Sequence, residues 1–376
     1  MAKIAFGTQR ISQYNPKHIQ ALKEAIKSGI TMIDTSISYM DGGAHEAIAL
    51  AFREFGDDVI DNIEVVTKFD INSDPQEIID SSLKNLELDY VDCFIIENPE
   101  SVLLKSLEDG MSKDDRLDEM NRVIFDAFLE CENLVRAGKI KSYGISSDNF
   151  SYLHNDNNFL PYEDLISLAL SAADELKNKI HSFTTIELPI NFIERDGLAC
   201  ASWAKSNNLR VIATRPLNTI KNNQVYRLAD YDESIEYYHH LNELLDVTDN
   251  DNLRALYNLI EQLDESKHKF GWIGDYETFL YTHAIPHIQK SLKLIDKQNA
   301  QTILTYIDMF LSEYKKMVEF ECARKTKISL KEELSGCTQN MQVCALNYLL
   351  NSDDVDYIAV GMRKSSYVNE VMSLAD

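Results

Sequence analysis

The 376-residue chain carries 61 acidic and 37 basic residues, which give a formal net charge of −24 and a pI near 4.7. This balance argues against binding to nucleic acid or to an anionic membrane surface, because no basic surface would remain to neutralise phosphates. The hydrophobic fraction of 44% is enough for a sizeable core, in one large α/β barrel or in two ordinary domains.

The chain also shows no sign of export or of a membrane span. Its first residues, MAKIAFGTQR, lack a basic segment followed by an apolar run, and no apolar run approaches the roughly 18 residues that a span needs. The cysteines are scattered without C-x-x-C spacing, so we expect reduced core residues and neither disulfides nor a metal framework. These cysteines are Cys93, Cys131, Cys200, Cys322, Cys337 and Cys344. Together these features predict a cytoplasmic protein.

Short apolar strands alternate with helical segments along most of the chain. The predicted strands cover residues 3–7, 30–34, 63–68, 91–97, 140–145, 182–188, 209–214 and 356–360. The predicted helices include 16–28, 117–137, 162–178, 197–206 and 341–350. Eight strands alternating with helices are the pattern of an α/β protein of the (β/α)8 TIM barrel type. A doubly wound open sheet is the competing fold, but Gly7-Thr8-Gln9-Arg10 is not its glycine-rich fingerprint.

One region interrupts this alternation. Between Leu217 and Met341 we find no convincing strand, whereas residues 234–245, 252–263, 288–295 and 300–320 have the apolar spacing of helices. We therefore predict barrel residues 1–217, a helical insertion at 218–340 and a last barrel unit at 341–376. The insertion enters between strand 7 and helix 7, so we expect it over the catalytic face. There it would act as a lid, or as a surface for a protein partner or for self-association.

Neighbouring histidines occur in this insertion. We interpret His239 and His240 as helix-surface residues, because adjacent residues on a helix point in different directions and do not chelate. No metal site is expected anywhere in the chain.

Three successive predicted strands deliver an ionisable residue at the same end. These residues are Asp34, Lys68 and Glu97, and Tyr39 follows the first of them. In a parallel barrel that end is where an active site lies. A tyrosine can donate a proton to a carbonyl oxygen if a buried cation lowers its pKa; Lys68 could be that cation, held charged by Asp34. The alternative is an ordinary Asp–Lys pair that braces two strand ends, with Tyr39 an interfacial aromatic.

The order of these residues resembles the aldo-keto reductase family. The family's motifs have the forms D-T-x-x-x-Y-x-x-G-x-x-E, T-K and D-Y-V-D-x-x-x-x-H-x-P. The matching segments here run from Asp34 to Tyr39, over Thr67-Lys68 and from Asp89 to Pro99, and Glu46 comes one residue later than the first motif expects. The resemblance implies that Asp34, Tyr39 and Lys68 take catalytic positions, and that Glu97 stands at the fourth, which is normally His.

Glu97 leaves the chemistry open. In an apolar setting beside Asp34 its pKa would be raised, and a protonated carboxyl group can donate a hydrogen bond. Glu at this place resembles the family members that reduce a carbon–carbon double bond conjugated to a ketone. Three possibilities therefore stay open and are weighted equally: alkene reduction, ordinary carbonyl reduction, and altered or lost catalysis.

The resemblance also implies NADP(H) as the cofactor, with NAD less favoured. The cofactor-binding positions that it implies are Gly7, Thr8, Ser146, Asn149, Glu187, Arg215, Arg363 and Glu370. An apparent two-residue insertion leaves open whether Ser147 or Asn149 takes the amide-binding role. Glu187 replaces a Gln, so it can accept a hydrogen bond but not donate one. Arg363 and Lys364 could meet a 2′-phosphate.

These residues predict an NADP(H)-dependent oxidoreductase that reduces a carbonyl or an activated alkene by hydride transfer, with Tyr39 as proton donor. Its substrate would be a small-molecule carbonyl or enone. The alternative is a catalytically weak or silent binding or regulatory protein on the same scaffold, because fold does not fix function. The altered residues Glu97, Glu187 and Thr214 favour that alternative, whereas the three intact catalytic positions favour the enzyme.

Overall fold

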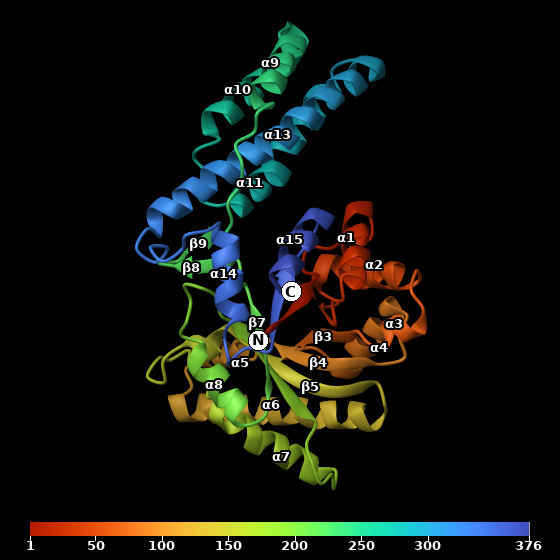
Figure 1. Cartoon of the computed structure of the whole chain (residues 1–376), viewed down its shortest axis with the longest axis vertical. Helices are drawn as coiled ribbons and strands as arrows, with labels where there is room; N and C mark the ends of the chain where they lie inside the picture. The colour runs from red at the N-terminus through yellow and green to blue at the C-terminus, as the bar shows by residue number, and fades with distance from the viewer. Residues whose placement is uncertain (376) are drawn as a thin grey trace. The chain divides into compact units, whose positions relative to one another are not determined.

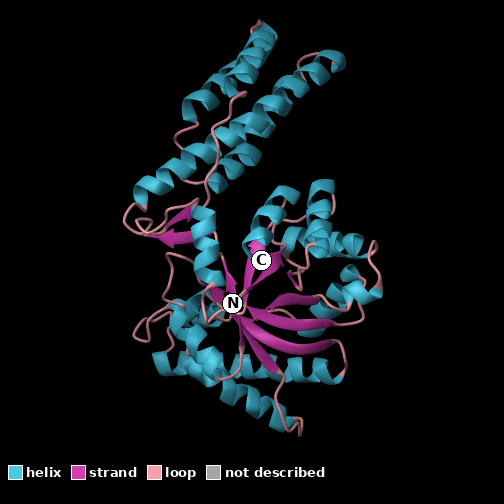
Figure 2. Cartoon of the chain, viewed as in Figure 1, coloured by secondary structure: helices cyan, strands magenta, loops and turns pink. Residues whose placement is uncertain are grey.

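Eight parallel strands close into a barrel within residues 1–375, which the computed structural model describes. Figure 2 draws these strands in magenta. Their order around the barrel is β1-β10-β7-β6-β5-β4-β3-β2, and each neighbouring pair is parallel. The strands are β1 (Lys3–Gly7), β2 (Met32–Asp34), β3 (Glu64–Asp70), β4 (Val91–Glu97), β5 (Ile140–Ser146), β6 (Phe183–Pro189), β7 (Arg210–Thr214) and β10 (Tyr357–Gly361). The predicted α/β TIM-barrel fold is confirmed, and the doubly wound sheet is excluded.

Helices follow the barrel strands in the expected alternation. They are α1 (Pro16–Lys27), α2 (Gly43–Phe52), α3 (Asp57–Ile60), α4 (Pro75–Leu86), α5 (Glu100–Glu108), α6 (Lys113–Arg136), α7 (Leu165–Glu175), α8 (Leu198–Ser206), α14 (Met341–Leu350) and α15 (Ser365–Ala375). Short 3₁₀ turns lie at η1 (Tyr39–Gly42), η2 (Asp148–Ser151) and η3 (Tyr162–Asp164). Helices α6 and α7 pack side by side (Figure 1).

Capping residues explain where several of these helices begin. The side chain of Asn15 accepts a hydrogen bond from the backbone N–H of Lys17, with Pro16 at the first helical position of α1. Asp74 and Pro75 start α4 in the same way. Each cap satisfies an N–H that the helix itself leaves without a partner, so the polar start signals in the sequence set the boundaries.

An apolar layer fills the middle of the barrel. It contains the buried residues Ala5, Met32, Val66, Cys93, Ile95, Ile212 and Tyr357, contributed by six of the strands. Because side chains alternate along a strand, Lys68 points to the same side of β3 as Val66, one layer nearer the carboxyl end. Polar groups at that end are therefore closed off from one direction by packed hydrocarbon.

The chain divides into two compact units, residues Met1–Pro216 with Ala345–Asp376 and residues Leu217–Cys344. The second, which we call the helical unit, has its own core, built around large buried side chains such as Tyr237, Phe310 and Tyr314. Its helices are α9 (Tyr237–Thr248), η4 (Asp251–Leu253), α10 (Arg254–Ser266), α11 (Ile273–Phe279), the π-helix η5 (Leu280–Ala284), α12 (Ile285–Leu292) and α13 (Lys297–Ser329). In chain order this unit lies between barrel strands β7 and β10.

The expectation that this region contains no strand is wrong. Strands β8 (Asn218–Lys221) and β9 (Gln224–Arg227) pair as an antiparallel hairpin (Figure 2). Asn222 and Asn223 join them with φ values of 52° and 59°, and Asn is one of the few residues that tolerate this left-handed conformation. Each strand spans only four residues, which is too short for an alternating pattern to stand out.

The expectation that all the cysteines are reduced is also wrong for two of them. Cys337 and Cys344 form a disulfide, with their Cα atoms 5.8 Å apart. Cys344 lies in the first turn of α14 and Cys337 in the loop before it, so the reversal of the chain brings them together at a spacing of seven residues. Cys93, Cys131, Cys200 and Cys322 are free and buried, as expected. Among the described helices, none has the length and apolar character to cross a membrane.

Candidate active site

Lys68 is the centre of a polar group at the carboxyl ends of the barrel strands. Its side chain is 1% exposed, and its Nζ lies 2.5 Å from Oδ1 of Asp34. The same nitrogen lies 3.3 Å from the hydroxyl of Tyr39 and 3.2 Å from Oε1 of Glu187. The structure therefore brings together three residues predicted as catalytic, and adds Glu187, which was predicted only as a cofactor-binding residue.

The chain after β2 explains how Tyr39 reaches this group. The backbone N–H of Thr35 donates to the carbonyl of Val66, so the chain stays paired with β3 just past Asp34. The turn η1 then reverses the chain through positive φ values at Met40 and Asp41. The ring of Tyr39, the first residue of this turn, lies with its centroid 5.5 Å from Nζ of Lys68. Because the amine lies only 3.3 Å from the hydroxyl, it contacts the oxygen end of the ring and not its face.

Charges in the group set the protonation of Lys68 and Tyr39. Burial lowers the pKa of Lys68, but the facing carboxylates Asp34 and Glu187 outweigh it, so the pKa lies well above its usual value and the amine stays charged. Burial raises the pKa of Tyr39; Lys68 lowers it, and Asp34 raises it further. The net shift of the Tyr39 pKa is upward, opposite to the expected one, because burial and the surrounding carboxyl groups together outweigh Lys68.

Glu97 ends β4 beside this group. The hydroxyl of Ser36 donates to its Oε2 over 3.4 Å. Burial raises the pKa of Glu97, Lys68 lowers it, and Asp34 raises it, with a net upward shift. The direction agrees with the sequence-based expectation for a carboxyl group in this position.

Glu187 is the residue whose surroundings sequence reasoning described least well. The hydroxyl of Ser146, its partner in the pairing of β5 with β6, donates to Oε1 of Glu187 over 2.9 Å. Burial raises the pKa of Glu187 to about 8, against the opposing effect of Lys68. The sequence held one signal for this contact: Ser146 and Glu187 both fall at the ends of consecutive predicted strands.

Three other predicted cofactor positions lie at or just after the ends of barrel strands. Thr8 is buried and donates through Oγ1 to the backbone carbonyl of Asp34 over 3.0 Å. A Cβ added at Gly7 would lie 3.4 Å from the carbonyl carbon of Val360, so the backbones of β1 and β10 approach closely there. Asn149 donates through Nδ2 to the carbonyl of Asn158 over 2.8 Å.

The alternative amide-binding residue also has a protein partner. The hydroxyl of Ser147 donates to Oε2 of Glu100 over 2.7 Å and accepts from the backbone N–H of Asn149 over 3.0 Å. The side chains of Ser147 and Asn149 are thus both held by neighbouring residues, and the choice between them stays a prediction.

The basic residues of the predicted cofactor set lie on two loops. Arg215, with φ 51°, follows β7 and forms ion pairs with Asp148 over 3.0 Å and Glu194 over 3.3 Å. Arg363 follows β10 and is half-buried, beside the exposed Lys364. Glu370 lies exposed on α15. Their roles toward a cofactor stay predictions.

His45 is a buried polar residue that sequence reasoning missed. It lies on α2, and its Nε2 is 3.0 Å from Oγ1 of Thr67, the residue before Lys68. Burial lowers the pKa of His45 to about 4, so the imidazole is neutral. Glu46, the next residue, faces solvent and accepts from Gln13. The one-residue delay of Glu46 relative to the family motif was the available signal.

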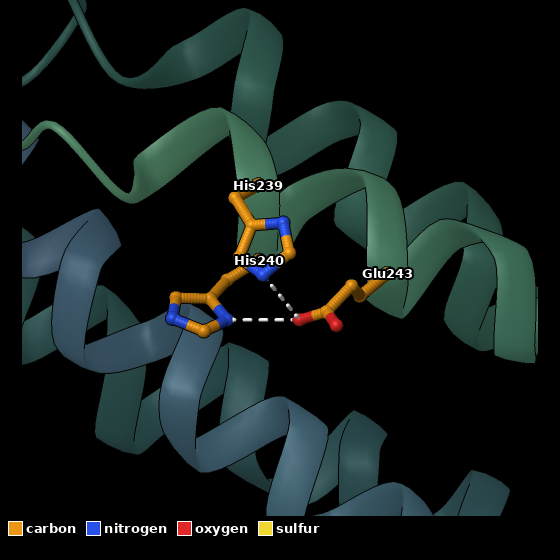
Figure 3. A group of neighbouring side chains, drawn as sticks. All are labelled: His239, His240 and Glu243. Carbon is orange, nitrogen blue, oxygen red and sulfur yellow. Dashed lines mark hydrogen bonds and ion pairs between the residues drawn. The ribbon is translucent and has the colours of Figure 1, made fainter.

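A second group of potential ligands occurs in the helical unit. On α9, Oε2 of Glu243 lies 3.5 Å from Nε2 of His239 and 3.1 Å from Nδ1 of His240 (Figure 3). The three ligand atoms lie within 4.8 Å of one another, so they could hold a metal ion. Both imidazoles approach the same carboxylate, His239 through Nε2 and His240 through Nδ1, and the expectation that they hold no metal stays a prediction. His239 is exposed, and its i, i+4 spacing to Glu243 is also that of an ordinary surface ion pair.

A closed parallel barrel with a buried Tyr–Lys–Asp group at its carboxyl end is the architecture that the motif resemblance implied. The sequence model of the aldo/keto reductase family matches residues 3–376 of the chain. The chain belongs to this family, whose members are typically NADP(H)-dependent carbonyl reductases.

Curated relatives match part of the chain. Human aldo-keto reductase family 1 member C2 is 32% identical over 167 residues, which cover 41% of this chain and 49% of the relative. The NAD(P)H-dependent D-xylose reductase I,II of Candida tropicalis is 25% identical over 233 residues, 58% of this chain and 68% of that protein. The chain thus spans about half the length of the first of these relatives.

One solved structure supports the fold, and a second is given beside it. A thermostable aldo-keto reductase in complex with the inhibitor epalrestat is 17% identical, covers 100% of this chain and 89% of its own, and has a TM-score of 0.50. An aldo/keto reductase from Klebsiella pneumoniae, solved with NADP and acetate, is 16% identical over 99% of this chain and 85% of its own, with a TM-score of 0.48. At these identities the likeness concerns the fold alone.

Proposed function

We propose that this chain is an NADP(H)-dependent oxidoreductase that reduces a carbonyl group or an activated carbon–carbon double bond, with Tyr39 as the proton donor. The observation that carries the proposal is the contact of one buried amine, Nζ of Lys68, with both Asp34 and the hydroxyl of Tyr39. A charged lysine at this distance stabilises the phenolate that forms when Tyr39 gives up its proton. Asp34 keeps that lysine charged and oriented.

The residues present offer a fit for a nicotinamide cofactor. Oε2 of Glu187 is buried and has no hydrogen-bond partner among the described residues, so a polar ligand group can pair with it. NADP(H), when bound, would supply the hydride. The residues proposed to hold it are Gly7, Thr8, Ser146, Asn149, Glu187, Arg215, Arg363 and Glu370.

Glu97 is proposed to determine which bond is reduced. Burial raises the pKa of Glu97 and so favours the protonated carboxyl group, and in that form Glu97 would donate a hydrogen bond to a carbonyl oxygen of the substrate. Such a bond draws electron density toward the oxygen and activates a conjugated alkene as well as the carbonyl itself. A small enone or carbonyl compound is therefore the proposed substrate class.

One observation favours a second candidate, a binding or regulatory protein with little catalysis. The pKa of Tyr39 is raised, because burial and the surrounding carboxyl groups outweigh Lys68. A phenol with a raised pKa is a weaker proton donor at neutral pH. Turnover assays therefore have to accompany binding assays.

Fluorescence titration with NADPH and NADH tests the cofactor proposal. We expect NADPH to bind, and Arg363→Ala to weaken NADPH more than NADH, because only NADPH carries a 2′-phosphate. Lys27→Ala, at an exposed position of α1, is the control and should change neither affinity. Equal weakening of both cofactors by Arg363→Ala would overturn the residue assignment, and the absence of any binding would overturn the cofactor proposal.

Glu97→His tests the role of the carboxyl group. We expect the wild type to reduce enones, and the variant to shift toward simple aldehydes and ketones. A wild type that already reduces simple aldehydes well, with a variant that does so less well, would exclude the alkene reading. The measurement is kcat/KM for a matched aldehyde and enone in both proteins.

A further inference from the structure

Glu187 differs in its two carboxyl oxygens. Oε1 is 3.2 Å from Nζ of Lys68 and accepts a hydrogen bond from Ser146 over 2.9 Å. Oε2 is buried with no hydrogen-bond partner among residues 1–375. The whole residue is 2% exposed. One oxygen thus receives two donors, which is the environment of a carbonyl oxygen, whereas the other lacks a partner.

The charges around Glu187 do not balance if every carboxyl group is ionised. The groups that face it are Lys68 from β3, Asp34 from β2, Glu97 from β4, Tyr39 from η1 and the hydroxyl of Ser146 from β5. The single amine of this set lies closer to Asp34, at 2.5 Å, than to Glu187. A second and a third buried carboxylate would share a cation that is already paired, and an uncompensated buried charge is strongly unfavourable.

We propose that Glu187 is a neutral carboxylic acid at neutral pH, and that its Oε2–H donates a hydrogen bond to a carbonyl oxygen of the bound ligand. This inference rests on the proposed function and makes it more specific. It also changes the sequence-based expectation, which allowed Glu187 to accept but not to donate. A protonated carboxyl group has the same acceptor–donor arrangement as a Gln amide.

The carbonyl oxygen has two possible sources, the carboxamide of the cofactor or the substrate itself. In either case the bond exists only while Glu187 holds its proton. Burial raises the pKa of Glu187 to about 8, so ionisation occurs at mildly alkaline pH. An ionised Glu187 would turn the lone pairs of Oε2, without a proton to donate, toward the ligand oxygen, and the affinity would fall.

The primary test is NADPH affinity between pH 6 and pH 9.5 in the wild type and in Glu187→Gln. If the cofactor supplies the oxygen, the wild-type affinity falls above about pH 8 by about tenfold per pH unit. The Gln variant keeps a donor that cannot ionise, so its affinity stays flat. If the substrate supplies the oxygen, NADPH affinity is flat and 1/KM for the substrate falls in the wild type alone. Flat profiles for both ligands in the wild type, or the same fall in the Gln variant, would overturn the proposal.

Ser146→Ala gives a second measurement on the same group. The Ser146 hydroxyl favours the ionised form and lowers the pKa of Glu187, so its removal should move the break in the pH profile to higher pH. A break that stays in place or moves to lower pH contradicts the assignment to Glu187. The comparison depends only on the midpoint, so a general loss of affinity in this variant does not obscure it.

The free energy of unfolding separates this proposal from the proposed function. Because the folded-state pKa of Glu187 lies above the usual 4.5, the native state keeps the proton longer than the unfolded chain does. The group's contribution to stability is present below about pH 4.5 and is lost as the pH rises toward about 8. The free energy of unfolding of the wild type minus that of Glu187→Gln should fall over this pH range. If the stability difference does not fall with rising pH, Glu187 does not carry the proposed proton. If the difference falls but NADPH does not bind at any pH, the proposed function and the ligand contact are overturned.

Discussion

The amine of Lys68 lies 2.5 Å from Oδ1 of Asp34, and the two side chains are only 1% and 6% exposed. Burying each of these two charges costs desolvation energy, and the attraction between them offsets that cost. Removal of the cation therefore exposes the cost of the carboxyl groups that remain. This relationship leads to the first prediction.

We expect Lys68→Met to lower the free energy of unfolding by about 3–5 kcal/mol, the usual cost of breaking a buried ion pair by removing one partner. Lys141→Met is the matched control, because Lys141 pairs with Asp92 on the surface and is 55% exposed. An exposed pair contributes at most about 1 kcal/mol. Chemical denaturation of both variants measures the difference. Equal stabilities would show that Asp34 and Glu187 do not depend on the lysine.

Tyr39→Phe removes the hydroxyl that Lys68 contacts over 3.3 Å. We expect turnover to fall by about 10²- to 10⁴-fold, the usual contribution of a positioned general acid, with NADPH affinity nearly unchanged. Tyr90→Phe is the control and should keep normal turnover. Tyr90 precedes the amino-terminal end of β4, whereas the site residue Glu97 lies at the carboxyl end of that strand. A Tyr39→Phe protein with normal kcat would remove Tyr39 from the mechanism.

His45 makes the stability of the barrel sensitive to acid. Burial lowers its pKa from 6.5 to about 4, so below pH 6.5 the unfolded chain binds a proton that the native state does not. Its contribution to stability is complete above about pH 6.5 and is lost as the pH falls toward 4. His45→Gln can keep a side-chain contact with Thr67 and should remove this loss.

The measurement for His45 is the free energy of unfolding between pH 4 and pH 7.5, compared between wild type and variant. His239→Gln, at an exposed position on α9, should keep the wild-type pH dependence. If His45→Gln loses stability in acid as steeply as the wild type, another group controls that transition.

The barrel could be predicted from the sequence because its signals are local. Each strand is a short apolar run, and residues such as Asp34, Lys68 and Glu97 stand at or near the strand ends in the printed order. Parallel strands then place those ends together without any knowledge of side-chain contacts. The fold class and the neighbourhood of Lys68 follow from these two facts.

The contacts of Glu187 could not be predicted in the same way. Lys68 and Glu187 are far apart in sequence and lie on β3 and β6, so their 3.2 Å approach depends on the width of the closed barrel. The upward pKa shift of Tyr39 follows first from its burial and then from the carboxyl groups around it. The disulfide between Cys337 and Cys344 was likewise hidden, because it depends on a loop conformation that no repeated motif announces.

The helical unit has a hydrophobic core of its own, formed by residues that all lie between Tyr237 and Cys322. The barrel core draws on none of these residues, since its central layer comes from β1 to β4, β7 and β10. Replacement of residues 218–340 by a short Gly/Ser loop should therefore leave a folded barrel. This independence makes the role of the insertion open to direct measurement.

We expect that replacement to change substrate range, turnover or oligomeric size, because the unit is proposed to act as a lid or a partner surface. Large apolar side chains remain exposed on it, including Ile235 at 93%, Tyr281 at 69% and Leu294 at 67%. Exposed apolar side chains mark a contact surface where they gather into one patch, whereas scattered ones are ordinary. Circular dichroism, NADPH titration, steady-state kinetics and light scattering on the same preparation separate the two roles, since a lid affects kinetics and a partner surface affects size. A folded variant unchanged in all four measurements would leave the insertion without either role.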